Sequence, residues 1–590
     1  MTVRLDTTRT LRLLIGLAQG VALYAAVSIM RETPFSPSSA FFLSGLFLIA
    51  LYVPPVAMLS LGNMPTRKLL TWLGILALVL GALAVHDIQR RIGTIDPNPT
   101  PRRWDGDNGP SAILILSCAL MVFIAHALMS AAHQDGRIIA RYSRYFDAAW
   151  KQAVQLSFAA AFTAALWLVL FLGAALFNML KMKFFEETIT NPLFYWSISC
   201  MAVSTAIHLT DVAPGIIAGI RKLALMLLSW LLPLMVLIAI GFLATLAATS
   251  LDLLWQTRRG AATVLIAAAT LIVLANAAYQ QGPPRDGEDG HIPAKTLAWA
   301  GAAIGPLLLV LIGLAAYATH LRVDQYGWTA DRVILAALVV IGALYAVGYS
   351  SAGLWGTAPC RRWEATNVAT SVVVVAIMAA LLSPVADPAR IAVDNQMQRL
   401  RSGLVGADKF DFVSLRFDGV RYGHEALHRL AAGTNSEIAA KAIAVQKAAN
   451  RYLAGQTPKT PITPQQVEAN LTVHPQGKPL PAGLTKPDQL SMECFTTADK
   501  SCDVVLLGRD RSGAELVMVI SGKSRPFAWL VRGDQGGKWQ SVGSFSWLCP
   551  EQKTALLQGQ VNLETALIPD VVVGGARLPL GTNVPTRTCP

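Results

Sequence analysis

Eleven long apolar stretches constrain this chain more than any other feature of its sequence. They are separated by short polar segments and lie near residues 11–30, 40–60, 69–85, 111–132, 154–179, 192–209, 223–246, 261–280, 296–317, 333–350 and 366–384. Each is close to the length that a helix needs to cross a hydrocarbon core of roughly 30 Å. Because a bilayer cannot satisfy exposed backbone groups, each stretch must be helical. The sequence therefore predicts an all-α polytopic membrane domain with about eleven transmembrane helices.

The composition favours the same class of protein. Hydrophobic residues make up 53% of the chain and charged residues 14%, which does not describe a soluble multidomain protein. The net charge of +13 is more typical of loops that set orientation and meet anionic lipid headgroups than of nucleic-acid binding. We therefore expect membrane lipids, and no nucleic acid, among the partners. The first apolar stretch follows Arg4, Arg9 and Arg12 and shows no clear cleavage site, which predicts an uncleaved first helix.

Beyond about residue 385 the composition becomes that of a soluble domain. Residues 387–455 show helical apolar spacing, and a linker, "GQTPKTPITPQQ", follows. The segments "CDVVLLGRDRSGAELVMVI" and "FAWLVRGDQGGKWQSVGSF" each contain two strand-like runs around a turn, which predicts two β-hairpins. We therefore expect a membrane domain over 1–384, a helical segment over 385–455 and a hairpin-rich domain over 456–590, the last two forming a C-terminal α+β soluble part.

Charge and cysteine distribution predict the orientation. With a cytoplasmic N-terminus, the inside loops carry fifteen Lys and Arg residues against eleven in the short outside loops. Cys494, Cys502, Cys549 and Cys589 all lie in the C-terminal part, and an even set of four suggests two disulfides in an oxidising, periplasmic compartment. The sequence leaves three pairings open, although Cys494 with Cys502 is the easiest to close. The alternative is four reduced thiols in a cytoplasmic domain.

A basic segment, "GRIIARYSRYFDAAWKQ", lies between the fourth and fifth apolar stretches. If it is helical, Arg137, Arg141, Arg144 and Lys151 share one face and aromatic residues the other, as in an amphipathic helix lying in the headgroup layer. Asp147 then stands at helical spacing from Arg144 and Lys151 and is their expected ion partner. These four basic residues are also candidates for binding a phosphate or lipid headgroup.

The phrase "HLRVDQYGWTADRV", residues 320–333, separates the ninth and tenth stretches and predicts an outside loop over 321–332. Gly327 suits a positive φ, Thr329 can cap the next helix, and Asp331 lies in its first turn. Arg322 and Asp324 are left unexplained, so they either bind a ligand or dock the segment that follows the last membrane helix, which we favour. We expect Asp324 or Asp331 to lie near Arg416 or Arg421, and these five residues form a candidate outer-face cluster.

The sequence contains no recognisable catalytic, nucleotide-binding or metal-binding motif, so we expect no cofactor and no metal. The segment "GRDRSGAELVMV" places Asp510, Ser512 and Glu515 at roughly the spacing of a calcium-binding turn, but Gly508 replaces the first carboxylate and a hairpin turn is favoured. His126 is the lone titratable candidate well inside an apolar stretch, where we expect a packed histidine bonded to a neighbouring helix.

Five phrases in order carry a family resemblance: "RYFDAAWK", "LFNMLKMKFF", "NAAYQQG", "VDQYGWTADRV" and "DKFDFVSLRFDGVRYGHEAL". Together they resemble the uncharacterised bacterial membrane family catalogued as domain of unknown function 4153, over roughly residues 140–430. The resemblance implies a polytopic protein of the bacterial cytoplasmic (inner) membrane. The family has no agreed activity, so it assigns no catalytic residues.

These observations favour a non-enzymatic envelope scaffold or sensor whose periplasmic domain binds a partner or envelope component. The alternative is a transporter or a lipid-linked glycan-modifying membrane enzyme that uses an outer-face carboxylate, for which Asp324, Asp331 and Glu32 are the candidates.

Overall fold

The computed structural model describes residues 2–92, 109–212, 214–249, 260–279, 295–354, 359–448, 451–454, 463–486, 490, 492–496, 500–510, 512–522, 527–534, 537–545, 550–561, 571–573 and 576–578. The chain divides into two compact units, Met1–Lys447 and Ala448–Pro590, and each is described by itself.

The first unit is built from long apolar helices, and eleven of those within the described residues are long and apolar enough to cross a membrane. These helices are α1 (Thr2–Glu32), α2 (Pro37–Ser60), α3 (Thr66–Arg91), α4 (Ala112–Asp135), α5 (Tyr142–Met179), α7 (Pro192–Val212), α8 (Pro214–Ala248), α10 (Gly260–Tyr279), α11 (Lys295–Tyr326), α12 (Ala330–Leu354) and α13 (Pro359–Leu381). A short helix, α6 (Phe184–Thr190), joins α5 to α7. The predicted number of transmembrane helices is therefore confirmed.

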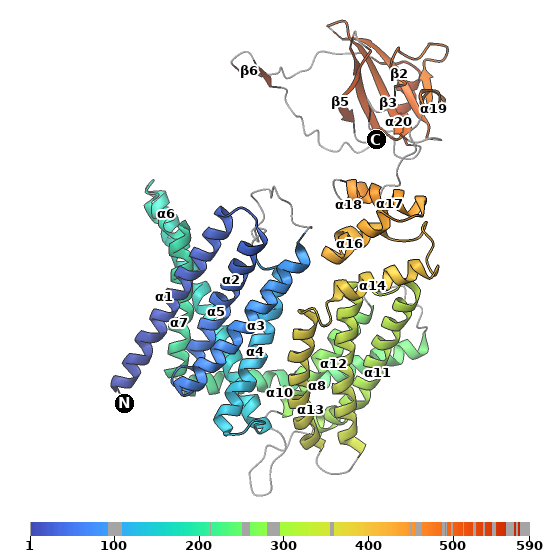
Figure 1. Cartoon of the computed structure of the whole chain (residues 1–590). Coiled ribbons are helices and arrows are strands. Elements are labelled where there is room, and N and C mark those ends of the chain that lie inside the picture. The colour runs from blue at the N-terminus through green and yellow to red at the C-terminus, as the bar shows by residue number, and fades with distance from the viewer. Residues whose placement is uncertain are drawn as a thin grey trace. The chain divides into compact units, whose positions relative to one another are not determined.

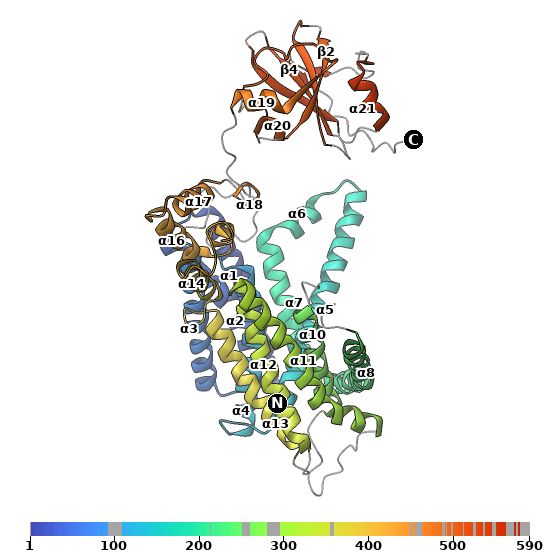
Figure 2. The same ribbon diagram turned by 90° about the vertical axis from the view of Figure 1, so that its right-hand side faces the viewer.

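The helices alternate in direction, so the two ends of the bundle carry different segments. The N-terminus of α1 lies at one end, and the last long helix, α13, delivers the chain to α14 (Pro388–Arg401) at the other (Figure 1). The start of α5 lies at the N-terminal end, whereas the α11–α12 connection lies at the α14 end, as expected for an odd number of crossings. Helix α8 crosses the other long helices at a steep angle and is seen nearly end-on in Figure 2.

The long helices enclose two main apolar cores. One core joins α8, α10, α11, α12 and α13 around Leu271, Ile304 and Leu308, which are fully buried. The other joins α1, α2, α3, α4 and α7 around Leu48 and Leu80. Val375, Met378 and Ala379 of α13, and Leu382 directly after it, also pack against this second core. The last membrane helix therefore covers part of the group formed by α1, α2, α3, α4 and α7. The apolar side chains that remain exposed, such as Leu78 and Leu168, are those that a surrounding bilayer would bury.

Three short helices follow α14 at the same end of the bundle: α15 (Phe412–Phe417), α16 (Val420–Ala431) and α17 (Ser436–Lys447). Helix α14 packs against α12 and α16, and α16 also contacts α3. The amphipathic spacing seen in the sequence is explained by this packing, because Ala426 and Leu427 of α16 and Ala442 of α17 are buried.

The second unit contains a five-stranded sheet in the order β1 (Leu471–His474), β2 (Cys502–Arg509), β3 (Glu515–Ser521), β4 (Phe527–Gly533) and β5 (Trp539–Phe545). Strand β1 pairs with β2 in parallel, and the other pairs are antiparallel. The two predicted hairpins are thus present as β2–β3 and β4–β5.

Both faces of this sheet are covered. Val504, Val519 and Val531 face a core that includes α19 (Pro464–Asn470) and α20 (Glu493–Thr496), and α21 (Pro550–Leu557) covers the opposite face. Helix α18 (Arg451–Ala454) precedes this domain, and a small hairpin of β6 (Val571–Val573) and β7 (Ala576–Leu578) follows it. The protein is therefore an all-α polytopic membrane domain with a C-terminal soluble part of mixed α and β structure.

Two predicted local structures are wrong. The basic segment between α4 and α5 is not a separate amphipathic helix: Gly136 ends α4 in the left-handed region, and α5 runs without interruption from Tyr142. Arg137 and Arg141 therefore precede α5 and share no helix face with Arg144 and Lys151. The predicted loop over 321–332 is also shorter, because α11 continues to Tyr326 and α12 begins at Ala330.

Candidate functional site

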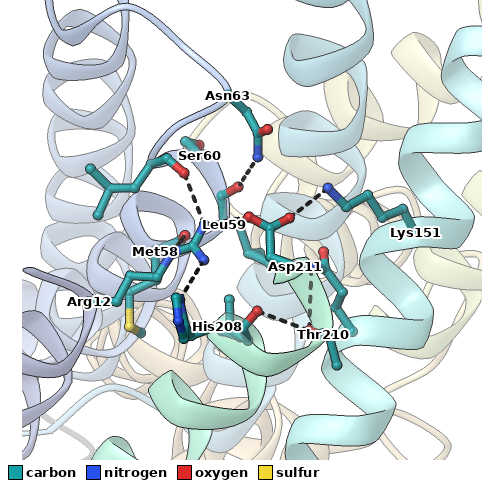
Figure 3. Close-up of polar contacts among 12 residues, drawn as sticks. Arg12, Met58, Leu59, Ser60, Asn63, Lys151, His208, Thr210 and Asp211 are labelled. Atoms are coloured by element: carbon teal, nitrogen blue, oxygen red, sulfur yellow. Dashed lines mark hydrogen bonds and ion pairs between the residues drawn. The ribbon is translucent and has the colours of Figure 1, made fainter. Parts of the chain in front are cut away.

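A buried arginine near the start of α1 organises the N-terminal end of the bundle. Arg12 is 2% exposed, and its guanidinium donates hydrogen bonds to the carbonyl oxygens of Met58 (3.1 Å) and Leu61 (2.9 Å) at the end of α2. It also pairs with the carboxylate of Asp211 at the end of α7, with 2.7 Å between Nη2 and Oδ2 (Figure 3). One cation thus satisfies helix-end carbonyls of α2 and a carboxylate of α7.

Asp211 has a second cationic partner. Nζ of Lys151, in the third turn of α5, lies 2.8 Å from Oδ1 of Asp211, so one carboxylate bridges α1 and α5 (Figure 3). Ser204 of α7 donates a hydrogen bond of 2.7 Å to the carbonyl oxygen of Arg12, which fixes α1 against α7. Two cations and one carboxylate leave a local excess of positive charge at this end of the bundle.

The other three predicted headgroup residues surround the α4–α5 turn. Arg141 makes two hydrogen bonds with Oδ1 of Asp135, and Arg144 lies 4.0 Å from the same oxygen. Arg137 is exposed beside Ile138, which is 97% exposed. Asp147, the expected partner of Arg144 or Lys151, instead pairs with Arg221 of α8 at 2.7 Å. Lys151 therefore belongs to the Arg12 cluster, whereas Arg137 and Arg141 lie on the turn that precedes α5 and Arg144 lies in its first turn.

A hydrogen-bonded network joins α5 to three helices of the core formed by α8, α10, α11, α12 and α13. Asn367 of α13 donates to Oδ1 of Asn276 on α10 at 2.6 Å, and Tyr142 of α5 donates to the same oxygen at 2.8 Å. Tyr349 of α12 donates to Oδ1 of Asn367 at 2.8 Å and stacks on Trp363 with ring centroids 4.5 Å apart. Such networks between helices specify which apolar surfaces meet, because each polar group needs its partner in hydrocarbon.

The short loop between α11 and α12 is held by α14. Gly327 adopts a φ of +74°, and Thr329 accepts a hydrogen bond from the backbone N–H of Arg332, as the sequence predicted. Arg399 of α14 donates to the carbonyl oxygens of Asp324 (3.2 Å) and Gln325 (3.0 Å). The segment "HLRVDQYGWTADRV" thus docks the chain that follows α13, but it does so mainly through carbonyl oxygens.

Two more side chains of α14 complete this docking. Gln396 donates to the carbonyl oxygens of Tyr326 (2.9 Å) and Trp328 (3.0 Å), and Asn395 accepts from the backbone N–H of Trp328 at 2.9 Å. The guanidinium carbon of Arg332 lies 5.5 Å from the centroid of the Tyr326 ring, in a cation–π contact. The α11–α12 connection and α14 are therefore joined by several hydrogen bonds between side chains of α14 and backbone groups of the connection.

The basic residues predicted to meet Asp324 or Asp331 have other partners. Arg416 donates through Nη1 to the carbonyl oxygens of Val445 and Gln446 in α17, and Arg421 pairs with Glu425 at 3.2 Å. Arg322 lies over the ring of Tyr326 at 6.0 Å. In the described part of the chain, the cation that reaches the α11–α12 connection from α14 is Arg399 rather than Arg416 or Arg421.

One buried carboxylate was missed by sequence reasoning. Asp387 is fully buried, and it caps α14 by accepting from the backbone N–H of Ala389. Nε2 of His86, in α3, lies 3.0 Å from Oδ2 of Asp387, and Nε of Arg90 lies 3.8 Å from it. Burial raises the pKa of Asp387, but the hydrogen bond from His86 and the positive charge of Arg90 lower it further, so the net pKa lies below its usual value.

The second unit contains one disulfide among the described cysteines, Cys494–Cys502, which was the pairing easiest to close. Both residues are buried in the core beneath the sheet. Cys549 and Cys589 lie outside the described residues. Asp510 forms a hairpin turn: its Oδ1 accepts from the backbone N–H groups of Ser512 and Ala514. The predicted hairpin turn is therefore present between β2 and β3.

Sequence signals for the missed residues were present but ambiguous. The Asp-Pro start of "DPARIAVDNQMQRLR" is typical of a helix N-cap followed by proline, which identifies Asp387 as a cap but not its partner. Arg12 looks like one of several charges that flank a first membrane helix. His126 is buried, and its Nδ1 has no hydrogen-bond partner among the described residues, so the expected bond to a neighbouring helix is not formed there.

The apolar helices, with ion pairs and hydrogen-bonded networks at their ends, define a multi-pass membrane protein. The chain belongs to the family described as Domain of unknown function (DUF4153), whose model matches residues 20–425. This match begins in α1, so the first four helices belong to the family as well as the region that carries the five phrases. No curated protein matches the chain. No solved structure matches it.

Proposed function

We propose that this multi-pass protein lies in the bacterial cytoplasmic membrane and acts as a non-enzymatic envelope scaffold or sensor. Its N-terminus is cytoplasmic, and its C-terminal sheet domain is a periplasmic module that binds a partner or envelope component. The observation that carries the proposal is the Cys494–Cys502 disulfide in the core of that domain. Disulfides form and persist in oxidising compartments and are rare in the reducing cytosol.

The shape of the sheet domain supports a binding role. Strand β5 is the last strand of the sheet in the described residues, and five of its residues, including Val542, are exposed. An exposed edge strand presents unpaired backbone groups and is a common place for another chain to add a strand. The partner that fits this surface is an extended peptide segment of an envelope protein.

The predicted orientation is tested with topology reporters. Fusions after residues 150, 325 and 430 should report cytoplasm, periplasm and periplasm, respectively. A cytoplasmic signal at 430 would overturn the orientation and with it the periplasmic role.

The disulfide gives an independent test in the intact protein. In a background in which the other five cysteines, Cys118, Cys200, Cys360, Cys549 and Cys589, are replaced by alanine, Cys494 and Cys502 should resist maleimide labelling in denatured, acid-trapped cells until a reductant is added. The matched control carries Cys494→Ala, which leaves Cys502 free to be labelled. Labelling of both thiols without reductant contradicts a periplasmic domain.

One observation favours the alternative, a transporter or lipid-linked glycan-modifying enzyme. The side chains of Asp324 and Asp331 are exposed at the α14 end of the bundle, where a carboxylate could act at the outer face. Lipid, glycan and metabolite profiles of a deletion strain separate the two functions. A scaffold leaves the products unchanged, whereas an enzyme loses a product that the wild-type gene restores and Asp324→Asn, at equal protein level, does not.

A further inference from the structure

A small cavity lies among the three short helices at the α14 end of the bundle. Its volume is about 170 Å³, and Arg416 of α15, His424, Leu427 and His428 of α16 and Gln446 of α17 line it. We call it the α15–α17 pocket. None of these five residues carries a carboxylate, so the lining is cationic and rich in hydrogen-bond donors.

The backbone around this pocket is unusually tight. Val420 begins α16 with a φ of +43°, a conformation that is strained for a β-branched residue. Gly423 packs directly against the carbonyl group of Leu415, where any Cβ would collide with the backbone. These two positions force a sharp turn between α15 and α16 and bring Arg416 beside the histidines. Such local strain is concentrated at functional sites.

The donors in the pocket are only partly used. Nη1 of Arg416 is bonded to the carbonyl oxygens of Val445 and Gln446, but its Nε and Nη2 make no hydrogen bond within the described part of the chain. Nε2 of Gln446 is buried and likewise has no acceptor among the described residues. A buried donor without an acceptor costs free energy unless a water or ligand supplies one.

The histidines differ in their roles. Nε2 of His424 donates to the carbonyl oxygen of Arg416 at 3.1 Å, which fixes the backbone that presents the guanidinium. Burial lowers the pKa of His424 below its ordinary value, so the ring is neutral at pH 7 and acts as a positioning residue. His428 lies one turn further along α16, exposed at the mouth of the pocket. A metal ion fits poorly, because Arg416 repels it and His424 has committed one nitrogen.

We propose that the α15–α17 pocket binds a phosphate group, with Arg416 as its main partner and Gln446 and His428 as further donors. The size fits this class, because the cavity is below the roughly 300 Å³ of a drug-sized site but large enough for a small anion with water. Guanidinium groups favour phosphate oxygens through short, charge-assisted hydrogen bonds.

The phosphate group has two sources that the position of the pocket allows. Helix α16 contacts α3 and α14, so the pocket lies at the α14 end of the helix bundle, and a lipid headgroup at that end is one source. A free phosphate ester in the surrounding solution offers the same chemistry. The inference goes beyond the proposed scaffold role, and its test does not depend on the C-terminal sheet domain.

The test uses the full-length protein purified in detergent. Titration calorimetry with inorganic phosphate measures free-anion binding, and native mass spectrometry counts bound phosphatidic acid against phosphatidylcholine. Arg416→Gln should weaken binding roughly tenfold, the loss expected for one charge-assisted contact. His428→Gln should weaken it by roughly threefold to fivefold. Arg429→Gln is the matched control, because Arg429 is exposed on the same helix and does not line the pocket.

Each outcome decides the proposal. Saturable binding of inorganic phosphate, reduced in both pocket variants, supports the site with a soluble ligand. Binding of phosphatidic acid alone, with the same variant pattern, supports the site with a lipid headgroup. His428→Gln keeps the test valid if Arg416→Gln fails to fold, since His428 lies at the surface. If the wild type binds neither probe, or if His428→Gln binds as tightly as Arg429→Gln, the proposal is overturned.

Discussion

Nε2 of His86 lies 3.0 Å from Oδ2 of Asp387, and this contact joins residues 301 positions apart in the chain. The same carboxylate caps α14, so the start of the segment that follows the membrane helices is bonded to the end of α3. The contact lies where a bundle of apolar helices meets the polar helices that follow it.

Replacing Asp387 by alanine should therefore destabilise the first unit. The change removes the N-cap of α14, leaves His86 without its buried hydrogen-bond partner and takes away the carboxylate 3.8 Å from Nε of Arg90. Together these losses cost about 2 to 4 kcal/mol. Thermal unfolding of the purified protein in detergent measures the loss. Asp411→Ala is the matched control, because Asp411 caps α15 from an exposed position and its removal should cost about 1 kcal/mol. Equal effects of the two changes would show that the contact with His86 contributes nothing.

The Arg12 cluster predicts an asymmetry between its two cations. Arg12→Met leaves the carbonyl groups of Met58 and Leu61 without their buried donor and should cost about 3 to 5 kcal/mol, seen as poor yield and a lower unfolding temperature. Lys151→Met removes a cation that is 43% exposed and should cost about 1 kcal/mol or less, because Arg12 still neutralises Asp211. The interpretation fails if Lys151→Met is as damaging as Arg12→Met.

Alanine substitutions at Gly327 and Gly403 distinguish the cost of backbone strain from the cost of side-chain crowding. A Cβ at this position would lie 2.6 Å from Nε2 of Gln396 and 2.7 Å from Cδ of Arg399, in addition to the positive φ. Gly403 has the same φ of +74° with nothing within 4 Å of an added Cβ, which makes Gly403→Ala a matched control. We expect Gly403→Ala to cost about 1 kcal/mol and Gly327→Ala to cost at least about 1 kcal/mol more.

Limited proteolysis reports whether this extra cost falls on the docking of α14. Gly327→Ala should speed cleavage between α13 and α15, whereas Gly403→Ala should leave that rate unchanged. Identical cleavage of the two variants would mean that α14 is not held by the α11–α12 connection.

The hairpin turn at Asp510 predicts a pH dependence in the second unit. Hydrogen bonds from Ser512, joined by those from the backbone N–H of Ala514 and the side chain of Arg532, lower the pKa of Asp510 to about 2. A carboxyl group whose pKa is lowered on folding stabilises the folded state fully above its unfolded pKa of about 4, and this contribution is lost as the pH falls through the folded value.

Unfolding temperatures of the wild type and Asp510→Asn should therefore differ by a constant amount above pH 5 and converge between about pH 4 and pH 2. Asp534→Asn serves as the control, because Asp534 forms a second turn in the same sheet by accepting from the backbone N–H of Lys538. A difference that stays constant down to pH 2 would contradict the lowered pKa of Asp510.

The membrane spans could be predicted because length and hydropathy alone determine them. Eleven stretches were long and apolar enough, and the structure extends them by a turn or more, as with α5 and α11. Helix pairing could not be predicted, because in a membrane protein both the lipid-facing and the buried sides of a helix are apolar. The two cores, and the placement of α13 against the second of them, therefore have no signature in the hydrophobic pattern.

The polar contacts were missed for a related reason. Arg12 and Asp211 are 199 positions apart, and each looks like an ordinary charge at the end of an apolar stretch. The alternation of helices placed Asp324 and the segment that follows α13 at the same end of the bundle, but which cation docks the loop depends on the rotation of α14 about its axis. That rotation is set by packing against α12 and α16, which one sequence does not show.

The packing of α13 has a consequence for biogenesis. Val375, Met378, Ala379 and Leu382 complete the core formed by α1, α2, α3, α4 and α7, so that core stays open while the ribosome is still making the second half of the membrane domain. These five helices must then wait in the bilayer, inserted but incompletely packed, until α13 emerges. Two separately expressed fragments, divided within residues 250–259, should assemble into a stable pair, whereas the N-terminal fragment alone should be degraded.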